Sequence, residues 1–133
     1  RERGFPIGVG EFAAMGLGHE TGAFGGFSRA QRERVRAALA AVGLEGHARQ
    51  PIDTLSGGQL QRTLFARLML QDAPVLLLDE PFSAIDQRTT VELLQLLRQW
   101  HAAGKTVLAV LHDLHQVRDA FPETLMLARE LVA

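Results

Sequence analysis

The clearest helical pattern along the chain lies between Ser28 and Gly43. Apolar residues recur there at i, i+3, i+4 and i+7, so they share one face of an α-helix. The residues on this face are Val35, Ala38, Leu39 and Val42. Ser28 and Gln31 form an S-x-x-Q capping box at the start, and Gly43 can end the helix in a left-handed conformation. The pattern predicts one amphipathic helix in this stretch.

Two other helical segments are predicted in the first half of the chain. A short helix lies around Val9, Phe12 and Met15, and the glycine-rich residues 16–27 after it read as a flexible surface loop. A longer helix begins directly after Ser56 and its two following glycines. Three leucines, each one helical turn from the next, would lie on one face of this helix: Leu60, Leu64 and Leu68.

The pattern changes in the second half. Val75–Leu78 is a continuous apolar run bounded by Pro74, as expected of a parallel strand that is covered on both faces. A helix follows and ends at Gly104. Its buried side would be Leu93, Leu94, Leu97 and Trp100. Residues 106–111 and 124–128 read as two further strands.

These segments together predict an α/β fold. A strand, a helix and a second strand in this spacing form a βαβ unit, whose two strands pair in parallel. Residues 1–71 would form a helical subdomain, and residues 72–133 would form the α/β part with a mostly parallel sheet. The 133 residues amount to about one domain.

Composition narrows the possible functions. The chain is 47% hydrophobic and 22% charged, with a net charge of −1, so nothing electrostatic indicates a nucleic-acid partner. Cysteine is absent, which excludes disulfides and thiolate metal sites. No apolar run approaches the ~20 residues of a membrane span. The chain starts at Arg1 rather than at a methionine and stops without a tail, so we expect it to be a fragment.

Titratable residues follow the first two predicted strands. Asp79 and Glu80 come directly after Val75–Leu78, and His112 follows the next strand. Because parallel strands end at the same edge of a sheet, and ligands bind at that edge, these three side chains are expected to converge. One carboxylate could hold a metal ion while the other orients or deprotonates water. The alternative is that the two carboxylates only cap the turn before Pro81.

The sequence Ser56-Gly57-Gly58 before a helix has the features of an anion site. A helix N-terminus offers unpaired N–H groups and a partial positive charge, and glycines let the backbone approach a phosphate closely. The serine hydroxyl adds a donor. The alternative is that Ser56 is simply the N-cap of the helix.

Four motifs resemble those of the ATP-binding subunits of ABC transporters. They are "LSGGQLQR", "VLLLDEP", "SAID" and "LHD", and their order and spacing are specific to that family. The resemblance extends over essentially the whole chain and implies a partial P-loop NTPase fold. It makes Leu55–Gln59 the signature motif, Val75–Asp79 the Walker B strand and Ser83–Asp86 the D-loop. The usual D-loop is Ser-Ala-Leu-Asp, and Ile85 is a conservative departure.

The resemblance also implies a head-to-tail dimer with a second nucleotide-binding subunit. In such dimers the signature motif of one copy grips the γ-phosphate of ATP that the other copy holds. Ser56, Gly57 and Gly58 would then contact a nucleotide that is bound by the other subunit. Gln59 would help to form the same surface. Asp86 would communicate across the dimer interface.

The catalytic residues implied by the resemblance lie at the strand ends. Asp79 would hold Mg²⁺ through water, as in other P-loop enzymes. Glu80 would polarise the attacking water, and His112 would contact the γ-phosphate. ATP and Mg²⁺ are therefore the expected substrate and cofactor, and the full-length protein would be an ATPase.

One family motif is missing. The sequence contains no G-x-x-x-x-G-K-[ST], the loop that cradles the α- and β-phosphates, and the Q-loop glutamine of the family would lie just before Arg1. We therefore expect this chain to be the C-terminal part of a nucleotide-binding domain. Alone it should neither bind ATP tightly nor hydrolyse it, because nothing holds the phosphate in place.

Within the family, the opening "GFPIGVGEFAAMGLG" and the ending "HDLHQVRDAFPETLMLARE" resemble bacterial importers of zinc and manganese. Gly8 and Gly10 depart from that pattern. The resemblance implies a peripheral subunit at the cytoplasmic face of the membrane, docked through its helical half on a separate permease that carries the cargo. His112 and His115 could alternatively form a metal pair.

Two other functions stay open at this point. One is a soluble ATPase of the same superfamily that is not tied to transport, although such proteins usually have basic surfaces or long coiled coils. The other is a non-catalytic remnant that only presents its signature motif to a complete partner. The presence of Glu80 and His112 argues against the remnant, since a signature donor would not need them.

Overall fold

The computed structural model describes residues 7–20 and 26–112. Helices come first along the chain and a strand–helix–strand unit follows them. In order, the elements are α1 (Val9–Ala14), the 3₁₀ helix η1 (Met15–Glu20), α2 (Arg29–Ala41), the 3₁₀ helix η2 (Ile52–Thr54), α3 (Gly57–Gln71), β1 (Val75–Asp79), α4 (Gln87–Ala102) and β2 (Thr106–Val110).

The two strands confirm the predicted α/β fold. β1 and β2 pair in parallel, with Val75 opposite Thr106 and Asp79 opposite Val110. Helix α4 connects them and contacts β2. The predicted third strand at 124–128 lies outside the described residues.

The amphipathic stripes of α2 and α4 are buried as predicted. Ser28 and Gln31 form the reciprocal capping box of α2, with the Ser28 hydroxyl accepting from the Gln31 N–H at 3.1 Å. Gly43 follows the helix with φ +77°, and Gly104 follows α4 with φ +102°. The buried apolar side chains of these two helical segments are Val35, Ala38, Leu39, Val42, Leu93, Leu94, Leu97 and Trp100.

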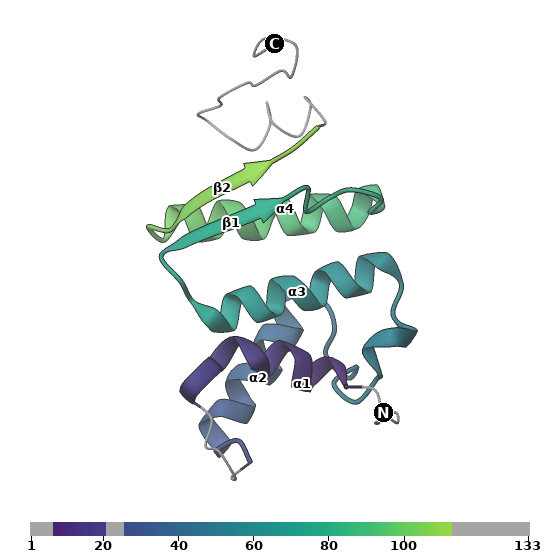
Figure 1. The fold of residues 1–133 in the computed structure, drawn as a ribbon, viewed down its shortest axis with the longest axis vertical. Coiled ribbons are helices and arrows are strands. Elements are labelled where there is room, and N and C mark those ends of the chain that lie inside the picture. Colours follow the sequence, from purple (N-terminus) through teal and green to yellow (C-terminus); the bar gives the residue numbers. More distant parts are fainter. Residues whose placement is uncertain (1–6, 21–25, 113–133) are drawn as a thin grey trace, which may run out of the picture.

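The buried residues of helix α3 are not on the face that carries Leu60, Leu64 and Leu68. Figure 1 shows α3 between α1 and α2 on one side and α4 with the two strands on the other. A helix between two layers needs two apolar faces, so a single leucine stripe does not describe its packing. Leu60 is 39% exposed and Leu64 and Leu68 are half-buried. The buried side chains are Thr63, Phe65, Ala66 and Leu70.

The prediction that β1 is covered on both faces is wrong for the described part of the chain. Leu76 and Leu78 point into the core, whereas Leu77 is 74% exposed and Val75 is 50% exposed. On β2, Leu108 is 54% exposed. Among residues 7–20 and 26–112, helix α4 covers one face of the pair and nothing covers the other. The outer face of β1 and β2 is therefore an exposed apolar surface.

The predicted flexible loop at 16–27 is in part a helix. Residues 15–20 form η1, which packs against α3. A Cβ at Gly16 would overlap the carbonyl oxygen of Arg67 in α3. The glycine at this position therefore permits close packing of two helices rather than flexibility.

The buried core is continuous between the helical layers and the sheet. Phe65 of α3 stacks on Trp100 of α4, with ring centroids 5.8 Å apart, and lies 6.2 Å from the ring of Phe82. All helices before α4 end by Gln71, and both strands follow. A division into subdomains at residues 71 and 72 stays a prediction, because this core crosses it.

Candidate functional site

Glu80 and His112 meet at the carboxyl edge of the parallel strands. The His112 Nε2 atom lies 2.8 Å from Glu80 Oε2. The two residues are far apart in sequence, but each directly follows a strand or nearly so, and β1 and β2 end side by side. The predicted convergence of these two side chains is therefore confirmed. The Oε1 atom of Glu80 has no hydrogen bond or ion pair with another described residue, and the Glu80 side chain is 39% exposed.

The backbone holds Glu80 in an uncommon conformation. Its φ is +49°, in the left-handed region that non-glycine residues rarely adopt. The Glu80 N–H donates to the Val110 carbonyl at 2.8 Å, and the Glu80 carbonyl accepts from the Ser83 N–H at 3.2 Å. These bonds and the buried Pro81 fix the turn. Such conformations cost roughly 1–3 kcal/mol and gather at functional sites.

Asp79 lies at the same edge, as the last residue of β1. It is exposed, and its carboxylate has no hydrogen bond or ion pair with another described residue. The structure therefore brings Glu80 and His112 into contact and leaves the Asp79 carboxylate free beside them.

Ser56 is the N-cap of α3, as the alternative to an anion site predicted. The Ser56 hydroxyl oxygen accepts from the Gln59 N–H at 3.1 Å, and the Gln59 side chain accepts from the Ser56 N–H at 3.0 Å. A hydroxyl has one donor and two acceptor sites, and no described residue accepts the Ser56 proton. Ser56 and Gly57 are exposed. The cap and an outward-facing anion site are therefore compatible.

Gly58 lies against the N-terminus of α4. A Cβ at Gly58 would lie 3.2 Å from Asp86 Oδ1 and 3.4 Å from Thr89 Oγ1. Asp86 caps α4, since its Oδ2 accepts from the Thr89 N–H at 3.1 Å. Hydrogen bonds from Thr89 hold the pKa of the Asp86 carboxyl below its ordinary value. The start of α3 and the start of α4 thus touch within one subunit.

These features share one side of the molecule. In Figure 1 the arrowheads of β1 and β2 and the N-termini of α3 and α4 all lie toward the right of the view. The Glu80–His112 pair follows the arrowheads, and Ser56 precedes α3. The strand ends that precede Glu80 and His112 and the helix starts that follow Ser56 and Asp86 therefore lie toward the same side of this view.

A family model described as "ABC transporter" matches residues 8–83, which is more than half of the chain. This chain belongs to the ABC transporter family. Its relatives include the manganese transport system ATP-binding proteins MntB of Listeria monocytogenes, 35% identical over 129 residues, and of Bacillus subtilis, 36% identical over 129 residues. Each alignment covers 97% of this chain, but only 54% and 52% of those proteins. The chain thus spans about half the length of the curated relatives it matches.

Solved structures agree with this ABC family assignment. The dimeric structure of MJ0796, a bacterial ABC transporter cassette, is 32% identical and superposes with a TM-score of 0.74. The alignment covers 86% of this chain and 50% of that one. A second structure shows the same cassette as a dimer in a post-hydrolysis state, bound to ADP and Pi, with the same scores. The α/β architecture is therefore that of the ABC ATPases.

The residues at the strand end fit a magnesium ion that arrives with a nucleotide. Mg²⁺ prefers oxygen ligands and usually keeps several waters, with one or two protein carboxylates and the substrate phosphates completing the site. Asp79 offers one exposed carboxylate of this kind. Where the structure describes the chain, it contains no group of three metal-ligating side chains. An all-protein metal cage is therefore not built from those residues, and the metal pair of His112 with His115 involves a residue outside them.

Sequence reasoning assigned no role to Arg62, the last residue of "LSGGQLQR". Its guanidinium donates to the Val42 carbonyl at 3.0 Å and to Thr89 Oγ1 at 3.1 Å, and lies 2.6 Å from Glu92 Oε1. These partners are 20 or more residues away, so no local pattern could identify them. The one available signal was an arginine on a helix otherwise rich in apolar and amide side chains.

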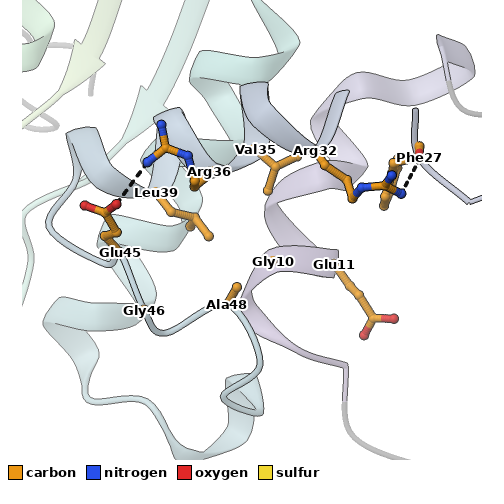
Figure 2. A pocket seen from close by; sticks show the side chains of 10 residues that line it. All are labelled: Gly10, Glu11, Phe27, Arg32, Val35, Arg36, Leu39, Glu45, Gly46 and Ala48. Atoms are coloured by element: carbon orange, nitrogen blue, oxygen red, sulfur yellow. Dashed lines mark hydrogen bonds and ion pairs between the residues drawn. The ribbon is translucent and has the colours of Figure 1, made fainter. Parts of the chain in front are cut away.

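The helical layers of this ABC-family chain contain a pocket of about 320 Å³. Figure 2 shows Val35 and Leu39 of α2 between two charged ends. At one end Arg36 pairs with Glu45 at 2.9 Å. At the other, Arg32 donates to the Phe27 carbonyl at 2.6 Å. The remaining lining residues are Gly10, Glu11, Gly46 and Ala48. Across residues 7–20 and 26–112, no helix has the length and apolar character of a membrane span.

Proposed function

We propose that this chain supplies the signature motif, the Walker B carboxylates and the switch histidine of an ATP-hydrolysing subunit that powers metal-ion import, with zinc or manganese as the cargo. The observation that carries the proposal is the 2.8 Å contact between Glu80 and His112 at the carboxyl edge of parallel strands. In α/β sheets this edge is where ligands bind. The manganese-transport names of relatives support the cargo class.

Glu80 acts as the base for the attacking water. Its Oε2 atom lies 2.8 Å from His112 Nε2, which leaves Oε1 to receive the proton of a water molecule. A positioned base of this kind typically contributes 10²–10⁴-fold, roughly, to the rate. His112 orients this carboxylate and, being 77% exposed, can also reach an oxygen of the γ-phosphate. The left-handed backbone of Glu80 keeps its side chain at this edge.

Ser56, Gly57 and Gly58 bind the terminal phosphate of ATP that a second subunit holds. The exposed Ser56 hydroxyl can donate outward while its oxygen caps α3, and the first-turn amides add donors at the positive end of the helix dipole. Gln59 stabilises this cap, because its side chain accepts a hydrogen bond from the Ser56 N–H. The dimeric cassette among the structural neighbours supports a head-to-tail pair of subunits.

Two further carboxylates complete the site. Asp79 would hold Mg²⁺ through water beside the phosphates. When bound, the ion neutralises negative charge on the β- and γ-phosphate oxygens. Asp86 keeps its charge while it caps α4 and touches Gly58, so it links the signature motif to the D-loop that faces the sister subunit.

The test is the turnover of the full-length subunit with Glu80→Gln. We expect a loss of about 10²-fold or more, because the amide cannot take a proton from water. Glu33→Gln on the exposed face of α2 is the matched control, since its ion pair with Arg36 is exposed and such pairs contribute little. Normal hydrolysis by the Glu80→Gln subunit would remove Glu80 from its role.

By itself, this chain neither binds ATP tightly nor hydrolyses it. Glu80, His112 and the Ser56-Gly57-Gly58 segment act on a phosphate that a Walker A loop must first hold. A nucleotide titration of the isolated chain that gave micromolar affinity would contradict this.

We infer that the pocket of Figure 2 is the contact surface for a separate permease, and that the subunit lies at the cytoplasmic face of the membrane. Ala48 lines the pocket and is exposed, so Ala48→Glu should weaken association with the permease. Ala37→Glu, at an exposed position of α2 outside the pocket, is the matched control. Co-purification measures both, and equal recovery of the permease with the two variants would contradict the assignment.

A further inference from the structure

Arg62 joins three helices that are separate in sequence. From the second turn of α3 it reaches the carbonyl of Val42, which ends α2, and both Thr89 and Glu92 on α4. The arginine side chain is only 16% exposed. A planar guanidinium can satisfy several partners in fixed directions, whereas a lysine ammonium is a single point charge.

Arg62 also lies one helical turn after Gly58, so both residues face α4 from the same side of α3. Gly58 approaches Asp86 and Thr89, and Arg62 donates to the hydroxyl of that same Thr89. The Thr89 N–H in turn donates to Asp86. The contacts form a closed ring from Arg62 through Thr89 and Asp86 to Gly58 and back along α3.

The charged groups around Glu92 distinguish its contact with Arg62 from its contact with Arg88. Glu92 Oε1 lies 2.6 Å from Arg62, and Arg88 approaches the other oxygen of Glu92 from solvent at 3.4 Å. The hydrogen bond from Arg62 is the largest cause of the lowered pKa of Glu92. Arg88 is 87% exposed. The two arginines therefore share one carboxylate, but only Arg62 is enclosed between helices.

We propose that Arg62 is a positioning residue that locks the signature motif to the D-loop, so that both reach the sister subunit as one rigid edge. The inference rests on the proposed function, because it concerns the surface that the signature motif presents in trans. In this role Arg62 acts indirectly, through Thr89, Asp86 and the start of α3.

The test uses mixed dimers of the full-length subunit. One subunit carries Glu80→Gln, so only the partner's Glu80 supports turnover, and the Glu80→Gln subunit donates the signature motif to that active site. Arg62→Lys is then placed either in the donating subunit or in the subunit with the intact Glu80. We expect turnover at saturating ATP to fall about ten-fold or more in the first placement and to stay unchanged in the second.

A general loss of stability would not produce this asymmetry. Because Arg62→Lys could lower the folded fraction, Thr89→Val and Thr89→Ser are tested in the same two placements. Valine removes the hydroxyl that accepts from Arg62, and serine keeps it. We expect Thr89→Val to reproduce the asymmetry and Thr89→Ser to match the parent dimer. Arg88→Lys, which alters the exposed contact to the same Glu92, should have no effect in either placement.

Equal turnover in the two placements of both Arg62→Lys and Thr89→Val would overturn the inference. The dimer with Glu80→Gln in both subunits reports separately on the proposed function. Turnover by that dimer would contradict the role of Glu80. The role of Arg62 is tested separately, by the difference in turnover between the two placements of Arg62→Lys.

Discussion

Phe65 and Trp100 stack across the middle of the molecule, with ring centroids 5.8 Å apart and planes inclined by 27°. Phe65 is in α3 and Trp100 is near the end of α4, so the contact joins the helical layers to the sheet layer. Both rings belong to the single buried core. The chemistry at the strand ends and the signature motif are therefore carried by one packed body within the described residues.

Phe65→Ala should destabilise the chain by about 3–5 kcal/mol, because it removes a fully buried aromatic ring and leaves a cavity. Trp100 is the only tryptophan, so its fluorescence follows the sheet layer while far-ultraviolet circular dichroism follows mainly the helices. The two signals should change together in urea. Leu60→Ala, at a position 39% exposed, is the control and should have a much smaller effect. Separate transitions for the two signals would contradict a single core.

Gly57 and Gly58 should respond differently to alanine. At Gly57 a new Cβ would lie 3.9 Å from the Ala84 carbonyl oxygen, which is ordinary contact. At Gly58 the Cβ would crowd a carboxylate that the Thr89 N–H holds in place. We expect Gly58→Ala to be less stable than Gly57→Ala by about 1 kcal/mol or more. Urea unfolding measures the difference. Equal unfolding midpoints of the two variants would contradict the prediction and show that the Asp86 side chain can move away from the new Cβ.

The Asp72–Lys105 pair should make stability depend on pH. Lys105 Nζ lies 2.5 Å from Asp72 Oδ1, and this hydrogen bond is the main cause of the lowered pKa of Asp72. A lowered folded-state pKa stabilises the fold above the unfolded value of about 3.9. That stabilisation is lost as the pH falls through the folded pKa. The stability difference between the parent chain and Asp72→Asn should therefore be present at pH 6 and vanish in acid.

Asparagine suits this test because it also tolerates the left-handed backbone of Asp72, where φ is +52°. Added salt should reduce the difference at pH 6, since the Asp72 side chain is 69% exposed. A difference that did not change between pH 6 and strong acid would assign the effect to packing rather than to the ion pair.

The exposed face of β1 and β2 should promote self-association of this chain. Leu77, Leu108 and Val110 are each more than half exposed on that face, and apolar patches of this kind favour association. Leu77→Glu should raise the concentration at which the chain stays monomeric, without lowering its stability. Val91→Glu on α4, at a position 44% exposed, is the control and should change association less. Sedimentation measures both variants.

The sequence by itself determined the elements whose signals are local. The Ser28 capping box and the apolar stripe of α2 depend on residues three or four apart, and so does the buried side of α4. It also determined that Glu80 and His112 would come together, because two paired parallel strands end at the same edge of a sheet independently of how the other elements pack. Of the family motifs, "VLLLDEP" and "SAID" adjoin these segments, whereas "LSGGQLQR" begins α3.

Tertiary structure alone decided which faces of α3 and β1 are buried. The leucine stripe of α3 is only partly buried because α3 lies between two layers, and Leu77 is exposed because the described residues cover β1 on one side only. Gly16 belongs to a helix that packs on Arg67 rather than to a loop. The role of Arg62 was hidden for the same reason: its partners Val42, Thr89 and Glu92 are distant in sequence, and only packing brings them within hydrogen-bonding distance.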